Sequence, residues 1–186
     1  MKIPQITIQD HIRASHVKRW HIVHTLTHQT LAEHNYNVAT IALYLYNEIP
    51  VPERHDRDVE HLLCHALSHD VVEIRTGDIP TPGKALIKHF AGDSIFRVIE
   101  QNVNPHSLGG DCFVVDCVHM ADLIDAAVWI MENGIGGRAE EVATKCWASM
   151  EAFVIKLNVE TELDWTRPVN KVLDAMTAPH LRSELS

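Results

Sequence analysis

The stretch Ser68-His69-Asp70-Val71-Val72-Glu73 places three ionisable side chains inside a segment that otherwise has the apolar periodicity of a helix. On a helix, His69 and Asp70 lie about 100° apart and Glu73 lies one turn further along, so all three reach one flank. Burying them without a partner would be costly, and a metal ion would satisfy them. A solvated polar face is the alternative interpretation, because His65 precedes His69 by four residues.

Two other apolar segments each contain polar residues in their interior. The pair Glu33-His34 lies inside one of them, and Asp122 lies inside the other. Together with His69 and Asp70, these residues offer two imidazoles and two carboxylates, a set that suits a divalent cation such as Zn, Co, Mn, Fe or Mg. Four protein ligands of this kind leave coordination positions open, which is typical of a catalytic metal site.

Helical periodicity dominates the chain, and no segment has the pattern of a β-hairpin. We therefore predict an all-α fold, a compact helical bundle. No linker or repeat divides it, so a single domain is expected over residues 1–186, with its core at about 13–130 and C-terminal helices at about 138–178. A rigid loop rich in proline and glycine spans 77–83, and helices are expected at 7–16, 30–49, 56–76, 83–91, 93–103, 111–132, 138–158 and 167–178.

Composition excludes several classes of protein. The formal net charge of −9 argues against a stable nucleic-acid partner, because such proteins usually carry a basic face. A small anionic substrate remains compatible, since a metal ion and a few basic residues can reverse the sign inside one cleft. No apolar run reaches the roughly 20 residues of a membrane span, and the first residues lack a signal-peptide pattern. We expect a cytoplasmic protein, in the host cytoplasm if it is viral.

The order of the motifs resembles that of the HD-domain phosphohydrolases. Lys18-Arg19-Trp20, Ala32-Glu33-His34, His69-Asp70-x-x-Glu73 and Thr76-Gly77-Asp78-Ile79-Pro80-Thr81-Pro82 follow one another along the chain. They look like the bacterial 5′-deoxynucleotidase branch, and like the small dATP triphosphohydrolases of phages that replace adenine by 2-aminoadenine. The resemblance covers about residues 13–130 and implies the HD-domain fold.

The resemblance also implies a ligand set for the metal. His34, His69, Asp70 and Asp122 would bind it. The segment that precedes Asp122 is shorter than in the bacterial enzymes, so Asp125, one turn further along, is the alternative fourth ligand.

Other residues of these motifs would act on the substrate, according to the same resemblance. Glu73 would position or deprotonate the attacking water, and Asp78 would assist as an acid or as a second polar anchor near the leaving oxygen. Arg19 would hold phosphate, and Trp20 would pack against the nucleoside.

Four further residues concern the choice of substrate. Lys84 and Lys88 follow the proline-rich loop at an interval of four, so both face one side of a helix and could bind the extra charges of a triphosphate. Two solvated surface lysines are the alternative. Ile22 offers an apolar wall that could exclude an extra amino group on a purine, unless it packs in the core. Pro80 could approach the sugar and favour deoxyribose.

The sequence thus predicts a metal-dependent triphosphohydrolase that cleaves a deoxynucleotide, dATP, to deoxyadenosine and triphosphate. The alternative is a 5′-deoxynucleotidase that releases phosphate from dNMPs. A third hypothesis is a regulatory module that binds nucleotide or metal without turnover. The resemblance further implies a homo-oligomer.

Overall fold

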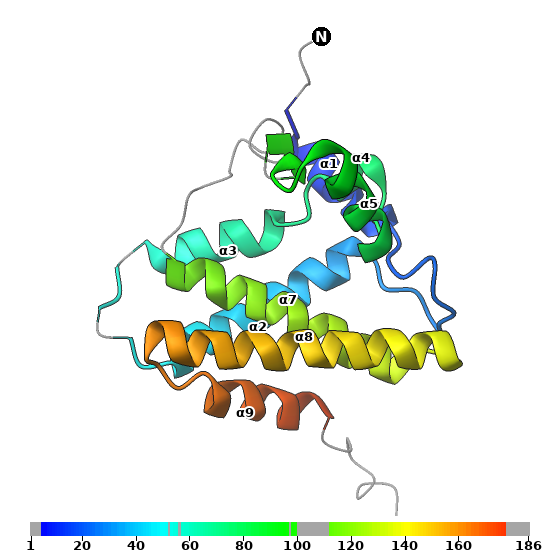
Figure 1. The fold of residues 1–186 in the computed structure, drawn as a ribbon. Coiled ribbons are helices and arrows are strands. Elements are labelled where there is room, and N and C mark those ends of the chain that lie inside the picture. Colours follow the sequence, from blue (N-terminus) through cyan, green and yellow to red (C-terminus); the bar gives the residue numbers. More distant parts are fainter. Residues whose placement is uncertain (1–4, 52, 56, 97, 100–111, 178–186) are drawn as a thin grey trace, which may run out of the picture.

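The computed structural model describes residues 5–51, 53–55, 57–96, 98–99 and 112–177 of the chain. Within these ranges the regular structure is helical, with no strand and two isolated β-bridges, Lys18 with Thr30 and Thr25 with Gly134 (Figure 1). The all-α prediction is confirmed. The helices are α1 (Ile8–Ile12), the 3-10 turn η1 (Arg13–His16), α2 (Leu31–Glu48), α3 (Asp58–Ser68), α4 (Glu73–Thr76), α5 (Thr81–Ala91), α7 (Cys112–Asn133), α8 (Gly137–Thr161) and α9 (Thr166–Thr177).

The start of α2 is fixed by local hydrogen bonds that the sequence encodes. Thr30 is the N-cap, and its hydroxyl accepts from the Glu33 amide while the Glu33 carboxylate accepts from the Thr30 amide. This capping box satisfies amide groups that have no partner within the helix. It sets His34 in the first turn, one residue beyond the box.

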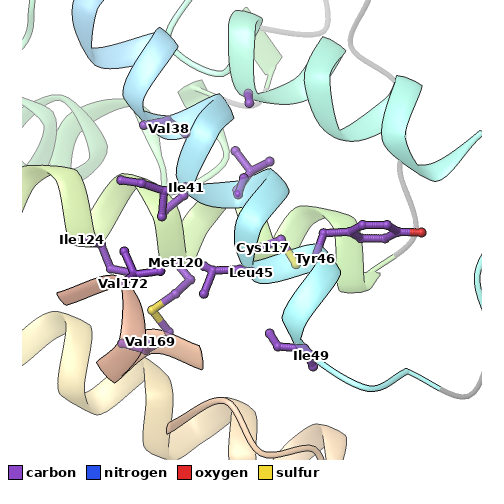
Figure 2. Close-up of a cluster of buried hydrophobic side chains, with 14 of the residues drawn as sticks. Val38, Ile41, Leu45, Tyr46, Ile49, Cys117, Met120, Ile124, Val169 and Val172 are labelled. Carbon is purple, nitrogen blue, oxygen red and sulfur yellow. The ribbon is translucent and has the colours of Figure 1, made fainter. Parts of the chain in front are cut away.

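The main apolar cluster holds α2, α3, α7, α8 and α9 together, and a second, small one includes Ile6 and Val71. α7 packs against α2, α3 and α8, and α9 closes the far side. Figure 2 shows side chains of α2, α7 and α9 meeting in this cluster, and all of those labelled are at most 9% exposed. Figure 1 shows α1, α4 and α5 grouped at the opposite end of the molecule from α9. None of the described helices is both long enough and apolar enough to cross a bilayer.

The prediction of one continuous helix at 56–76 is wrong. The structure has two helices there, α3 and α4, separated by a turn at residues 69–72. In a continuing helix, the carbonyls of Ala66 and Leu67 would accept from the amides four residues later. Here His69 Nδ1 contacts the Ala66 carbonyl at 2.8 Å, and the Asn35 side chain donates to the Leu67 carbonyl at 3.3 Å. The backbone therefore tightens, and the Val71 amide donates to a carbonyl three residues back.

The other predicted helices differ from the structure mainly at their ends. α5 begins at Thr81 instead of residue 83, because proline is tolerated in the first turn and Pro82 lies there. Of the helix expected at 93–103, residues 95–96 and 98–99 are helical, and 100–103 lie outside the described residues. The helices expected at 111–132, 138–158 and 167–178 correspond to α7, α8 and α9.

Candidate metal and nucleotide site

Three elements bring the predicted ligands to one point. His34 comes from the first turn of α2, His69 and Asp70 from the turn between α3 and α4, and Asp122 from α7. The Nε2 atom of His34 lies 3.2 Å from His69 Nε2, 3.2 Å from Asp122 Oδ1 and 3.7 Å from Asp70 Oδ2. Donor atoms of His34, His69 and Asp70 all lie within 4.8 Å of one another.

The far nitrogen of each histidine is held by an oxygen. His34 Nδ1 lies 2.6 Å from Asp125 Oδ2, and His69 Nδ1 lies 2.8 Å from the Ala66 carbonyl. Both oxygens accept hydrogen bonds, so both Nδ1 atoms donate and both neutral rings present a lone pair at Nε2. Two such lone pairs facing each other at 3.2 Å, beside two carboxylates, form a donor set that fits a divalent cation.

The charges around the cluster also favour a cation. Burial opposes ionisation of Asp122, but when the imidazoles are protonated, a hydrogen bond from His34 and the charges of His34, His69 and Arg19 hold the pKa of Asp122 well below its usual range, so a cation at their place would be held in the same way. Burial and Arg19 oppose protonation of His34, yet Asp122 and Asp125 raise the pKa of its imidazole. The site therefore keeps negative charge and attracts positive charge.

Asp122 and Asp125 lie on opposite sides of the His34 ring. Asp122 faces Nε2, where the other candidate ligands converge, whereas Asp125 faces Nδ1. Both oxygens of Asp125 already accept hydrogen bonds, Oδ2 from Gln29 at 2.7 Å and Oδ1 from Asn37 at 2.8 Å. The geometry thus favours Asp122 as the fourth ligand, whereas Asp125 orients the His34 ring.

Glu73 lies next to this cluster and is 3% exposed. Burial and the neighbouring charge of Asp70 raise the pKa of Glu73 to about 7, while Lys84, whose Nζ lies 2.7 Å from Oε1, opposes the rise. A carboxyl group with a pKa near neutrality can both take and return a proton, which suits general acid–base catalysis.

Arg19 and Asp78 line the approach to the cluster. Arg19 Nη1 lies 3.7 Å from Asp70 Oδ2 and is buried with no hydrogen-bond partner among the described residues. A guanidinium in this state is suited to an incoming anion. Asp78 Oδ2 lies 3.3 Å from His21 Nδ1, and the Asp78 side chain is mostly buried.

Two cavities meet at the cluster. The larger, of about 490 Å³, is lined by Arg19, Trp20, Ile22, Asp78, Pro80 and Asp122 among others. The smaller, of about 170 Å³, is lined by His69, Val72, Glu73, Lys88 and Phe96. Asp70, Ile79 and Lys84 border both cavities. The two cavities therefore share part of their walls beside the metal ligands.

Trp20 forms part of the apolar wall of the larger cavity, and its own position is fixed. Its backbone has a positive φ of 64°, which is uncommon for a bulky residue. The indole stacks on Trp129 with centroids 5.5 Å apart and planes 6° apart, and Nε1 donates to Gln29. Ile22 is 49% exposed and lines the cavity, so it is not a core residue.

Some residues of the site were not identified from the sequence. Arg138, Lys145 and Ser149 of α8 line the larger cavity, and their intervals of seven and four residues place them on one helix face. That periodicity was a usable signal. Gln29 and Asn37 gave none, because their partner Asp125 lies far along the chain and only packing brings them together.

Comparison with known proteins identifies the family. A family model described as 5′-deoxynucleotidase YfbR-like matches residues 11–110. The chain belongs to the YfbR-like family. A dATP triphosphohydrolase of Salmonella phage PMBT28 is 32% identical to this YfbR-like chain over 144 residues, which cover 70% of the chain and 69% of that relative. A dATP triphosphohydrolase of Cyanophage S-2L is 31% identical over 164 residues, and the match covers 83% of this chain and 89% of that relative.

A solved structure shares the YfbR-like fold. The Cyanophage S-2L HD phosphohydrolase DatZ, bound to dA and one catalytic Zn²⁺ ion, superposes with a TM-score of 0.70 at 24% identity, and the match covers 92% of this chain and 95% of that one. The predicted resemblance to HD phosphohydrolases is confirmed, and the chain is an enzyme of the hydrolase class.

Proposed function

We propose that this YfbR-like protein is a metal-dependent dATP triphosphohydrolase, which releases deoxyadenosine and triphosphate. The observation that carries the proposal is the pair of cavities that meet at the His–Asp cluster. A nucleoside would occupy the larger, and the phosphates beyond the first would extend into the smaller. The phage relatives described as dATP triphosphohydrolases support this assignment.

The metal site would consist of His34, His69, Asp70 and Asp122. We propose a divalent ion, with zinc first because the DatZ structure contains a catalytic Zn²⁺ ion, and Co, Mn or Mg as alternatives. Such an ion, when bound, polarises a phosphoryl oxygen and lowers the pKa of water. Asp125 keeps the His34 ring turned so that Nε2 faces the ion.

The nucleoside would lie against Trp20, Ile22 and Pro80, which share the larger cavity. Trp20 offers a flat face fixed by stacking and by its hydrogen bond to Gln29. Ile22 offers an apolar edge without a hydrogen-bonding group, so it selects by size, and a purine bearing an extra amino group would be excluded. Pro80 would approach the sugar.

The phosphates would lie between Arg19 and the two lysines of α5. The buried guanidinium of Arg19 can hold the first phosphate in a bidentate contact and offset the charge that develops there. Lys84 borders both cavities and Lys88 only the smaller, so the lysines follow the direction in which a triphosphate would extend.

Glu73 and Asp78 would handle the protons of the reaction. Glu73 would orient the attacking water and accept its proton as the water oxygen bonds to the α-phosphorus. The bond between that phosphorus and the 5′ oxygen would break, and the proton that Glu73 has accepted would pass, with the assistance of Asp78, to the 5′ oxygen to give the nucleoside. The pKa of about 7 at Glu73 suits the first of these transfers.

A 5′-deoxynucleotidase acting on dNMPs is the second candidate, favoured by the description of the family model. Incubation with the four dNTPs and the four dNMPs, across Zn, Co, Mn and Mg, separates the two by their products. Triphosphate from dATP supports the first function, whereas phosphate from dAMP with dATP untouched supports the second. The double variant H69A/D70A should lose metal and turnover together. Turnover of neither substrate class by the metal-loaded protein would favour a regulatory nucleotide-binding module.

We also propose that copies of the chain associate as a homo-oligomer, folded as one domain each. The described part of α5 buries no residue completely, and it exposes Leu86 by 60% and Phe90 by 81% on one face. Contiguous apolar exposure favours a protein contact. Light scattering with size-exclusion chromatography would test this, with Phe90→Glu expected to yield monomers. We propose the host cytoplasm as the place of action and no stable nucleic-acid partner.

A further inference from the structure

Gln29 connects the apolar wall of the substrate cavity with the metal site. Its Oε1 accepts from the Trp20 indole Nε1 at 2.9 Å, and its Nε2 donates to Asp125 Oδ2 at 2.7 Å. The same Asp125 oxygen accepts from His34 Nδ1 at 2.6 Å. A single chain of hydrogen bonds therefore runs from Trp20 to the imidazole whose other nitrogen faces the metal cluster.

The chemistry of the two ends requires an amide between them. An indole N–H can only donate, and an ionised carboxylate can only accept. The side chain that joins them must therefore accept at one end and donate at the other. Glutamine does this, whereas an ionised glutamate of the same shape would place a second carboxylate against Asp125.

The residues that form this series of hydrogen bonds are also held rigidly. Gln29 is 2% exposed, Asp125 1% and His34 0%, so water does not replace any of these contacts at low cost. The Gln29 carbonyl accepts from the Arg19 amide at 2.9 Å, which fixes the backbone that presents both Arg19 and Trp20. Trp20 keeps its positive φ within this frame.

We propose that Gln29 is a positioning residue that couples the nucleoside-facing Trp20 to the metal ligand His34 through Asp125. The proposal rests on the metal and nucleoside sites assigned under Proposed function. It predicts that a change at Trp20 alters metal binding, although the Trp20 indole N–H is hydrogen-bonded to Gln29 and not to a metal ligand.

The test is a double-mutant cycle read as zinc affinity, by competition with a chromogenic chelator and without substrate. Gln29→Met keeps the volume but removes both hydrogen bonds. We expect it to weaken zinc binding by roughly 10-fold, the lower end of the range for outer-shell partners of metal ligands. Trp20→Phe should weaken zinc binding several-fold in the parent protein and have no further effect in the Gln29→Met background.

A matched control is Tyr46→Phe, which also removes one buried hydrogen bond, at the other end of α2 and away from the site. It should lower stability without changing zinc affinity. The near-ultraviolet circular dichroism of the stacked Trp20–Trp129 pair gives a second readout, which Gln29→Met should alter and Tyr46→Phe should not. For dATP hydrolysis, Gln29→Met should raise KM and lower kcat, because it loosens both sites.

Unchanged zinc affinity in Trp20→Phe would overturn the proposal, whether or not Gln29→Met folds. An equal effect of Trp20→Phe in both backgrounds would also overturn it, since the coupling would then bypass Gln29. These readouts need no turnover. A protein that fails to hydrolyse dATP but shows the coupling would refute the proposed function and leave the role of Gln29 standing.

Discussion

The Nζ atom of Lys84 lies 2.7 Å from Oε1 of Glu73. A lysine predicted to bind phosphate is thus paired with the carboxylate proposed to orient water. Its positive charge favours the ionised form of Glu73, against burial and Asp70, which raise the pKa of that group to about 7. Binding of phosphate at Lys84 would weaken this support, so the two functions are linked by one contact.

Replacing Lys84 by methionine should move the acid limb of kcat/KM to higher pH. Without the ammonium, the pKa of Glu73 rises further, and a larger share of the enzyme carries a protonated carboxyl that cannot accept a proton. The pH profile of dATP hydrolysis measures this. An acid limb at the same pH in K84M would show that Glu73 is not the group that titrates.

Lys88 should act on binding alone. It is exposed and lines only the smaller cavity, beyond the cluster. An exposed ion pair contributes about 0.2–1 kcal/mol. Lys88→Met should therefore raise KM for dATP up to about fivefold, leave kcat unchanged and leave binding of dAMP unchanged. Steady-state kinetics with dATP and competition by dAMP measure these effects. An equal loss of affinity for both nucleotides would contradict a role of Lys88 in binding the outer phosphates.

Much of the fold could be predicted because local sequence and tertiary packing agree. Thr30 and Glu33 encode the start of α2, and a long apolar run marks α7. Prediction failed at residues 69–72, where the apolar period continues while the helix does not. Asn35 and His69 take the carbonyls that the helix needs, and a side chain of α2 cannot be placed there from sequence alone.

The site could be predicted in part for a similar reason. His34, His69, Asp70 and Asp122 were selected as polar points in apolar segments. The first three converge, and Asp122 lies beside His34. The choice between Asp122 and Asp125 depended on which face of His34 each one meets. Both lie on one flank of α7, so only the packed structure separates them.

Asp122 and Asp125 should therefore respond differently to the same change. Asp122→Asn removes a proposed ligand and should reduce zinc affinity by more than 100-fold. Asp125→Asn keeps the ligands but weakens the hold on His34 Nδ1, and should cost about 10–100-fold. Zinc content by mass spectrometry and affinity by chelator competition measure both, and the reverse order would make Asp125 the ligand.

Asp58 should contribute stability that depends on pH. Its carboxylate accepts from the His55 amide at 2.8 Å and from the Tyr46 hydroxyl at 3.0 Å. The hydrogen bond from His55 lowers the pKa of Asp58, against burial, and Tyr46 adds to the lowering. A pKa lower in the folded state gives stability that is complete above the unfolded value, about 3.9, and is lost as pH falls through the folded value.

Asp58→Ala should thus lower the free energy of unfolding at neutral pH by about 1–3 kcal/mol, because the buried Tyr46 hydroxyl and the His55 amide lose their acceptor. The loss should shrink as the pH is lowered. Urea unfolding at a series of pH values measures it, with Glu53→Ala as an exposed control. A loss that is equal at all pH values would show that packing, and not the carboxylate, supports this end of α2.

Ile22 should decide between adenine and 2-aminoadenine. It lines the larger cavity without belonging to the core, so its truncation enlarges the substrate site at little expense of stability. Apolar pockets discriminate by size to the extent of about 10–200-fold. In Ile22→Ala, the ratio of kcat/KM for dATP to that for 2-amino-dATP should fall toward one, mainly because the larger base is now accepted.

Leu26→Ala is the matched control, since Leu26 is 73% exposed and does not line the cavity. A ratio unchanged by Ile22→Ala would place the 2-amino group elsewhere in the site.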